Sequence, residues 1–267
     1  MTSGFLFFAR YATFKVKCKP MNKTSIDIVV GATGGIGEEF TKILAREAVR
    51  PVICLVRRLE DARKLFADFP TVEPVYCADL TDQEVVDACI SDLASKGYVP
   101  VRVFLAAGSF KWDNDSRKQN YPSVAEIADM LDKANFMTKD TVQKALKKVF
   151  PTDIKGMTVL FLGSQAANFA EDDERRVNRT TGFKEEGYVI SMQKVARLAH
   201  TLQEQVGKED GFGRVILEEP GLIDTPMARE EFTPETIGNQ IDWSTVVSPE
   251  NYAKLVFAQH NLYQKAA

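Results

Sequence analysis

The chain has 267 residues, of which 45% are hydrophobic and 27% charged, and its formal net charge is −3. This length is typical of one α/β domain, and the near-balanced charge gives no electrostatic argument for a nucleic-acid partner or an anionic membrane surface. No apolar run approaches the ~18 residues of a membrane-spanning helix, and "GFLFFA" near the start is far too short.

Residues 1–24 are rich in lysine and arginine and contain no acidic residue. An organellar transit peptide has this composition. An extension upstream of a start at Met21 or an added edge strand are the alternatives, and "TFKVKCK" alternates apolar and basic residues as a strand does. We rank the extension or the strand above a transit peptide. Residues 1–24 are thus expected to form a basic extension, and residues 25–267 a single domain.

From Ser25 onward, short apolar runs alternate with segments of helical periodicity. In chain order, the predicted strands are "SIDIVV", "PVICLV", "VEPVYC", "VRVFLAA", "MTVLFLG" and "RVILEEPG". The predicted helices are "GEEFTKILARE", "LEDARKLFADF", "DQEVVDACISDLASKG", a long region from "SVAEIADML" to "ALKKVF", a helix beginning near Tyr188, and "ENYAKLVFAQHNLY". Nearly continuous apolar strands indicate a parallel sheet buried on both faces. The β-α alternation predicts an α/β fold, a Rossmann-type doubly wound parallel sheet flanked by helices.

The sulfur and imidazole side chains do not predict a metal site. The chain has four cysteines without metal-ligand spacing: Cys18, Cys54, Cys77 and Cys89. Buried reduced thiols are expected, which indicates a reducing compartment such as the cytoplasm. The two histidines, His200 and His260, stand far apart and without a pattern of carboxylates.

The first predicted strand leads into "GATGGIG", in which Gly31, Gly35 and Gly37 open a helix. Side chains at these positions would keep the backbone away from a pyrophosphate, and the helix N-terminus supplies free N–H groups and partial positive charge. Glycines also make ordinary tight turns. Their place between a strand and a helix at the start of a βαβ unit predicts a dinucleotide site.

The second predicted strand ends in "VRR", where an NAD site would have an acid for the ribose hydroxyls. Arg57, with Arg58 behind it, suits a 2′-phosphate instead. Two solvated surface arginines are the alternative. The absence of an acid at the strand end favours NADP(H).

From Ser25 to about Val256 the chain resembles the short-chain dehydrogenase/reductase family, whose motifs occur in order. "GATGGIG" looks like the family's cofactor turn, "ADL" resembles the acid that contacts the adenine, and "PGLIDTPM" resembles the segment that cradles the nicotinamide. "AAG" occupies the usual Asn-Ala-Gly place, with Ala106 instead of asparagine. Together with the arginines, the resemblance implies these cofactor contacts: Gly31, Thr33, Gly34, Gly35, Ile36, Gly37, Arg57, Arg58, Asp79, Leu80, Ala107, Gly108, Pro220, Gly221, Ile223 and Thr225.

The C-terminal part departs from the family, which usually ends with a seventh strand and a Gly-Gly pair. This sequence stops soon after "ENYAKLVFAQHNLY". A sheet of six strands is therefore expected, or of seven if "TFKVKCK" takes the vacant edge.

The resemblance also implies a catalytic asparagine, serine, tyrosine and lysine around the nicotinamide. Asn135 matches the asparagine in the long helical region, and Ser164 matches the serine just past the fifth strand. An asparagine within a helix and a serine ending a strand are the ordinary alternatives. We favour the catalytic interpretation for both.

The tyrosine and lysine fall in "YVISMQK", which allows two registers. Either Tyr188 is the tyrosine and Met192 replaces the lysine, or Lys194 is the lysine and Ile190 replaces the tyrosine. The following helix decides, because its core-facing positions should be apolar. In the first register these positions are Val195, Leu198 and Leu202, and in the second they are Arg197, His200 and Glu204. The first register is therefore predicted.

Loss of the lysine changes the expected chemistry. A nearby ammonium lowers the pKa of a phenol from ~10 towards ~7, which represents about 4 kcal/mol. The resemblance implies that the lysine also holds the nicotinamide ribose and joins a proton relay, and methionine does neither. Lys194 lies two positions further on, about 200° around the helix, so it should point away.

The leading hypothesis is an NADP(H)-dependent oxidoreductase that reduces a carbonyl of a small organic substrate, with Tyr188 as proton donor and Ser164 polarising the oxygen. The direction of reduction is favoured because it needs the neutral phenol. The alternative is a non-catalytic NADP(H)-binding protein, a sensor or partner-binding module. Reduction of an activated C=C bond is a third possibility.

The remaining expectations concern loops and partners. Residues 227–243 should form a lid over a carbonyl or alcohol substrate, and residues 170–187 a solvated loop. The resemblance implies a homodimer or homotetramer.

Overall fold

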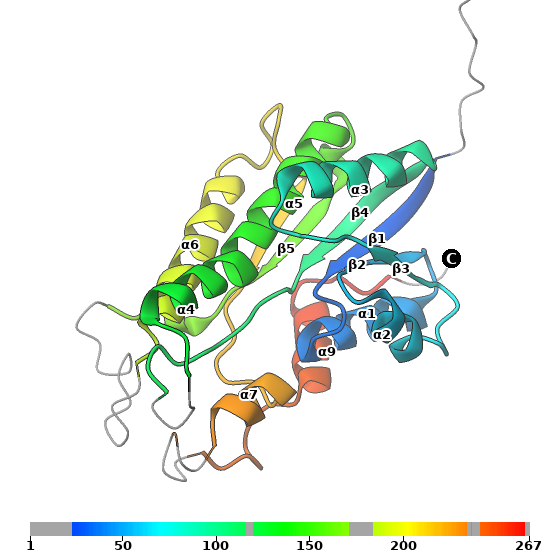
Figure 1. Cartoon of the computed structure of the whole chain (residues 1–267). Coiled ribbons are helices and arrows are strands. Elements are labelled where there is room, and N and C mark those ends of the chain that lie inside the picture. The colour runs from blue at the N-terminus through cyan, green and yellow to red at the C-terminus, as the bar shows by residue number, and fades with distance from the viewer. Residues whose placement is uncertain (1–22, 116–119, 171–183, 234–235, 237–240, 265–267) are drawn as a thin grey trace, which may run out of the picture.

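Six strands form one sheet at the centre of the computed structural model, which describes residues 23–115, 120–170, 184–233, 236 and 241–264. The strands are β1 (Thr24–Val30), β2 (Val52–Val56), β3 (Val72–Tyr76), β4 (Tyr98–Leu105), β5 (Thr158–Leu162) and β6 (Arg214–Glu218). They lie in the order β3-β2-β1-β4-β5-β6, and every pairing is parallel (Figure 1). The predicted doubly wound parallel sheet is confirmed.

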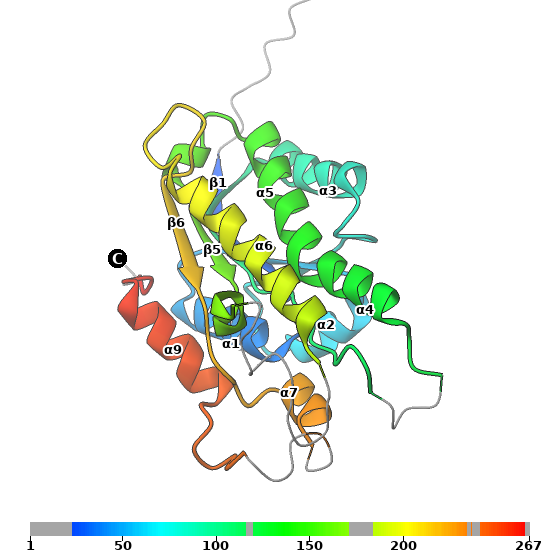
Figure 2. The same cartoon turned by 90° about the vertical axis from the view of Figure 1, so that its left-hand side faces the viewer.

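Two layers of helices cover the sheet. On one face lie α3 (Gln83–Ser95), α4 (Val124–Leu131), η1 (Asp132–Met137), α5 (Thr138–Val149) and α6 (Glu186–Gln203). On the other lie α1 (Gly35–Glu47), α2 (Leu59–Leu65) and α9 (Pro249–Gln259). Figure 2 shows α6 running beside the α4–α5 rod over the first of these faces. Each layer has its own apolar core, so the strands are buried on both sides, as their continuous apolar sequences predicted.

Shorter helical segments connect these layers. They are η2 (Ile154–Gly156), η3 (Gln165–Asn168) and α7 (Pro226–Glu231). The predicted second helix ends at Leu65 instead of Phe69, because the N–H of Phe69 bonds the carbonyl of Phe66 in a tight turn, 2.9 Å away. Pro70 follows and disfavours a helical conformation at the residue before it.

The long helical region predicted after β4 is present, but a π-helical segment, η1, interrupts it. The Thr138 hydroxyl donates to the carbonyl of Lys133, 3.0 Å away and five residues earlier in the chain. Single π-turns inside α-helices often mark functional sites. Asn135, one of the expected catalytic residues, lies within this segment.

Some expectations fall outside the described residues. The possible seventh strand in residues 13–19, most of the extension 1–24 and most of the loop 170–187 are among them. None of the helices in the described part of the chain is long and apolar enough to cross a membrane.

Candidate active site

A cavity of about 570 Å³ opens at the carboxyl ends of β1, β4, β5 and β6. The strand order reverses between β1 and β4, and this switch point is where doubly wound sheets bind their ligands. Most of the predicted site residues line the cavity: Thr33, Gly34, Gly35, Ile36, Gly37, Ala107, Gly108, Ser164, Tyr188, Pro220, Gly221, Ile223 and Thr225. The sheet therefore brings together segments that are up to almost 200 residues apart in sequence.

The glycine turn between β1 and α1 is packed too closely for side chains. Gly31 has φ +86°, and a Cβ atom there would lie 2.5 Å from the Ala107 nitrogen. A Cβ on Gly37 would lie 2.2 Å from the Gly31 carbonyl oxygen. These glycines let the backbone of the turn pack against the end of β4, which forms the floor of the cavity.

The first turn of α1 faces this cavity with backbone groups. Its N-cap is Gly34, which makes no side-chain cap, so the first N–H groups of the helix stay available to a ligand. The Thr225 side chain lies against Gly35 and caps α7, because its hydroxyl accepts the Ala228 N–H at 3.1 Å. An uncapped helix N-terminus behind a bare glycine turn fits the pyrophosphate of a dinucleotide.

The residues expected around the adenosine half lie at the same edge of the sheet but outside the cavity. Arg57 and Arg58 follow β2 and are exposed, and Arg58 is 3.5 Å from the Asp61 carboxylate. Asp79 follows β3, where the hydroxyl and N–H of Thr81 donate to it and lower its pKa. The positive charge of Arg57 contributes to the same lowering, which places this arginine near Asp79. Leu80 is buried beside them.

Tyr188 and Ser164 meet in the cavity. Both line it. Burial raises the pKa of Tyr188 to about 12, and the nearby Ser164 side chain partly opposes this rise. Helix α6 presents Tyr188 in its first turn, and the buried Asp113 carboxylate accepts the Gly187 N–H at the start of that helix at 3.2 Å. Asp113, which the sequence did not single out, therefore helps to fix the position of Tyr188.

Asn135 does not line the cavity. Its side chain is fully buried, with its amide oxygen accepting the Ser109 N–H at 2.7 Å. Its amide nitrogen donates to the Ser109 carbonyl at 3.0 Å and to the Ser191 hydroxyl at 2.9 Å. The Ser191 hydroxyl donates to the carbonyl of Tyr188, 2.8 Å away. Asn135 thus connects the loop after β4 to the helix that carries Tyr188.

The faces of α6 agree with the predicted register. Val195 and Leu202 are buried in the core, whereas Arg197 and His200 are exposed. Met192 is 4% exposed and lines the cavity.

Lys194 points away from the cavity, as its position on the helix predicted. Its ammonium lies 2.7 Å from the Asp132 carboxylate and 5.7 Å from the centre of the Phe136 ring. The segment "YVISMQK" therefore brings no lysine into the cavity wall.

A different lysine lies behind the wall. Lys139, on α5, is fully buried, and its ammonium donates to the carbonyl of Asn135 at 2.8 Å and to the carbonyl of Ala107. Burial lowers its pKa to about 7. The sequence held a signal for this residue: Lys139 continues the core-facing stripe of Ile127, Leu131, Asn135, Val142 and Leu146.

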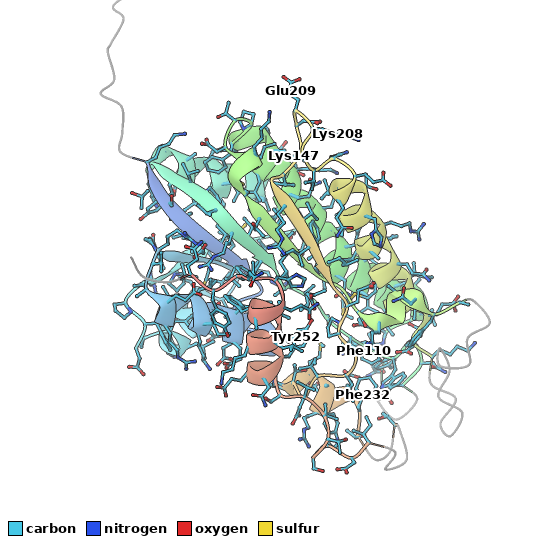
Figure 3. The ribbon with its side chains drawn as sticks, turned by 180° about the vertical axis from the view of Figure 1, so that it is seen from behind. Phe110, Lys147, Lys208, Glu209, Phe232 and Tyr252 are labelled. Carbon is cyan, nitrogen blue, oxygen red and sulfur yellow. The ribbon has the colours of Figure 1, made fainter. Side chains whose placement is uncertain are left out.

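Aromatic rings line part of the cavity wall. The Phe110 ring centre lies 4.8 Å from that of Tyr188 and 4.9 Å from that of Phe232. Figure 3 shows Phe110 and Phe232 close together beside α7. Met227 and Phe232, from the segment expected to form a lid, line the cavity. Such a wall suits an apolar group.

Comparisons with known proteins agree with this geometry. Residues 25–121 match the family model described as KR domain. No curated protein sequence matches the chain significantly.

Solved structures resemble the whole fold. A short-chain dehydrogenase/reductase from Vibrio parahaemolyticus is 21% identical with a TM-score of 0.65, over 87% of this chain and 89% of that one. A short-chain dehydrogenase from Burkholderia cenocepacia in complex with NADP is 19% identical with a TM-score of 0.65, over 90% of this chain and 85% of that one. A variant of actinorhodin polyketide ketoreductase with NADPH is 18% identical with a TM-score of 0.68, over 88% and 89%. At these identities the likeness is one of fold.

Proposed function

We propose that this short-chain dehydrogenase/reductase, a family assignment that the KR-domain match and the structural neighbours support, uses NADP(H) to reduce a carbonyl group of a small organic substrate. Tyr188 is the proton donor and Ser164 orients the carbonyl oxygen. The observation that carries the proposal is that both side chains line the cavity at the glycine turn, with Ser164 close enough to influence the pKa of Tyr188.

The turn at Gly34–Gly37 and the N-terminus of α1 would hold the pyrophosphate, and Arg57 would pair with a 2′-phosphate. When bound, NADPH supplies the hydride that reaches the carbonyl carbon. Three structural neighbours contain NADP⁺, NADP or NADPH, which supports this choice of cofactor.

The protein's own part is to orient the carbonyl oxygen and to give it a proton. Ser164 donates a hydrogen bond to that oxygen, and the Tyr188 proton completes the alcohol. Because burial raises the pKa of Tyr188 to about 12, the phenol is neutral at physiological pH. A neutral phenol is the form that reduction requires, so the site favours reduction over oxidation.

The test is NADPH consumption with a panel of apolar and aromatic aldehydes and ketones. Tyr188→Phe should abolish turnover while leaving NADPH binding intact, since only the proton donor is removed. Ser164→Ala should lower kcat by about 10²- to 10³-fold, as loss of one oxyanion donor does. Unchanged rates in Tyr188→Phe would overturn the proposed role.

A second candidate, a non-catalytic NADP(H)-binding protein, is favoured by one observation. Met192 lines the cavity, and the charged side chains among the described lining residues are Glu185 and Glu230, both acidic. Such a protein would bind NADPH but reduce none of the carbonyl compounds. Met192→Lys would then create activity where the unmodified protein has none, whereas turnover by the unmodified protein excludes this candidate.

A further inference from the structure

The buried ammonium of Lys139 differs from an ordinary structural lysine because no acid compensates it. It donates to two backbone carbonyls, those of Asn135 and Ala107, and no carboxylate of the described residues pairs with it. Removing a charge from water without a counter-charge costs several kcal/mol. A methionine or leucine would fill the same place without this cost, so stability alone gives no reason for a lysine here.

The place of this ammonium connects it to the reaction cavity. Ala107, whose carbonyl it holds, lines the cavity, as does Gly108 next to it. Lys139 therefore lies one peptide group behind the cavity surface. An ammonium bonded to the Ala107 carbonyl polarises the Ala107–Gly108 peptide, which belongs to the cavity wall.

A second route leads from Lys139 to the proton donor. Its other partner, the carbonyl of Asn135, belongs to the residue whose side chain bonds Ser191. Ser191 in turn bonds the carbonyl of Tyr188. The ammonium thus stabilises the π-helical segment that aligns the start of α6.

We propose that Lys139 is a positioning residue of the reductase site, supplying from α5 the buried positive charge that Met192 cannot supply from α6. This inference rests on the proposed function. Lys139 acts through the Ala107–Gly108 peptide and through Asn135, and its ammonium stabilises the negative charge that develops on Tyr188 as the proton leaves.

The charged form of Lys139 is then the active one, so the rate should depend on pH. Burial is the one cause of its lowered pKa of about 7. Helix α5 packs against α3, whose titratable groups are Glu84, Asp87, Cys89 and Asp92, and against η1, which carries Asp132 and Lys133; Tyr188 and Lys194 lie on the neighbouring α6. NADPH, once bound, would add negative charge and raise the pKa of Lys139, so kcat should fall at or above pH 7 as Lys139 loses its proton.

The first experiment compares Lys139→Met with the wild type. Below pH 7 we expect kcat to be about 10- to 100-fold lower, the size of effect that lost orientation and charge stabilisation produce. The fall of kcat at or above pH 7, which we call the pH break, should disappear. Lys139→Gln keeps a hydrogen-bond donor without the charge and should lose the same pH break. Lys144→Met, an exposed position on the same helix, is the matched control and should change neither.

The decisive variant is Lys139→Met combined with Met192→Lys. If the site needs a positive charge, the double variant should have a kcat at least ten-fold above that of Lys139→Met. This activity should persist to higher pH than that of the wild type. A lysine with a packing role alone would not be replaced from another helix. No rescue, together with a pH profile in Lys139→Met identical to that of the wild type, would overturn the proposal.

A readout without turnover separates this inference from the proposed function. The NMR signal of the Lys139 side chain, identified by its absence in Lys139→Met, should titrate near pH 7 and shift to a higher pKa when NADPH is added. A signal insensitive to NADPH would overturn the role of Lys139 even in an active reductase. A wild type that binds NADPH but reduces no carbonyl compound would overturn the proposed function, and the role of Lys139 would fall with it.

Discussion

The amino and carboxyl edges of the sheet each have a buried cation, and the two are held in opposite ways. Arg102, paired in register with Thr158 at the start of β5, is 4% exposed and contacts Asp27 at 2.7 Å and Glu47 at 2.8 Å. Burial alone would lower its pKa, but the bonds and charges of these acids outweigh burial and raise it. Lys139, at the carboxyl end, has backbone carbonyls as its partners, and its pKa is lowered.

The difference follows from what each end of the sheet does. Arg102 also donates to the carbonyl of Leu262, so its cluster fastens the segment after α9 to the sheet, far from the cavity. Asp27 and Glu47 compensate its charge, so Arg102 stays protonated. Lys139 sits behind the cavity wall, where an uncompensated charge can respond to a ligand. A buried cation that acids compensate belongs to a structural ion cluster, whereas a buried cation without such acids is a candidate for function.

The largest expected effect is on stability at the amino end. Arg102→Met should lower the free energy of unfolding by about 3–5 kcal/mol, because it leaves two buried carboxylates without their partner. Urea denaturation measures the loss. The exposed Arg214 on β6 is the control, and its replacement by methionine should cost less than ~1 kcal/mol. A mild loss in Arg102→Met would mean that Arg50, 3.3 Å from Asp27, is enough to hold the acids.

A smaller effect on stability, which depends on pH, is expected at the carboxyl end. Unfolded Lys139 keeps its proton up to its ordinary pKa of 10.5, whereas folded Lys139 loses it near 7. Between these values the unfolded chain binds more protons, so the free energy of unfolding should rise with pH, by a few kcal/mol at most. Lys139→Met should lose this dependence and be at least as stable as the wild type at pH 7. Denaturation midpoints over that range test it, and a pH-independent difference between the two proteins would contradict it.

The sequence predicted the sheet more completely than it predicted these charges. The strands and the glycine turn follow from local patterns: continuous apolar runs indicate a parallel sheet buried on both faces, and glycines between a strand and a helix indicate a dinucleotide site. Met192 and Lys194 could also be placed, because the helical period fixes which face each one occupies. The catalytic role expected for Asn135 stays a prediction; in the structure its side chain joins Ser109 to Ser191.

Lys139 and Asp113 were missed for a physical reason. A lysine or an aspartate in a sequence is exposed in most proteins, and burial is decided by tertiary contacts that a single sequence does not show. The π-turn in η1 is equally non-local, because it depends on how α6 and the loop after β4 pack against it. The available signal was a lysine in an otherwise core-facing stripe, which a search by helical position would have found.

The smallest effect is expected for a third cation, Lys194, whose side chain is 41% exposed and paired with Asp132. Lys194→Met should cost less than ~1 kcal/mol of stability, as partly exposed ion pairs do. It should leave kcat within about twofold, because its ammonium points away from the cavity. Asp132→Asn is the matched control, since it breaks the same pair and leaves the lysine in place. A large loss of kcat in Lys194→Met alone would mean that Lys194 leaves Asp132 for the cofactor when NADPH binds. The positive charge of the site would then come from α6 after all, and Lys139 would be left without a role in the reaction.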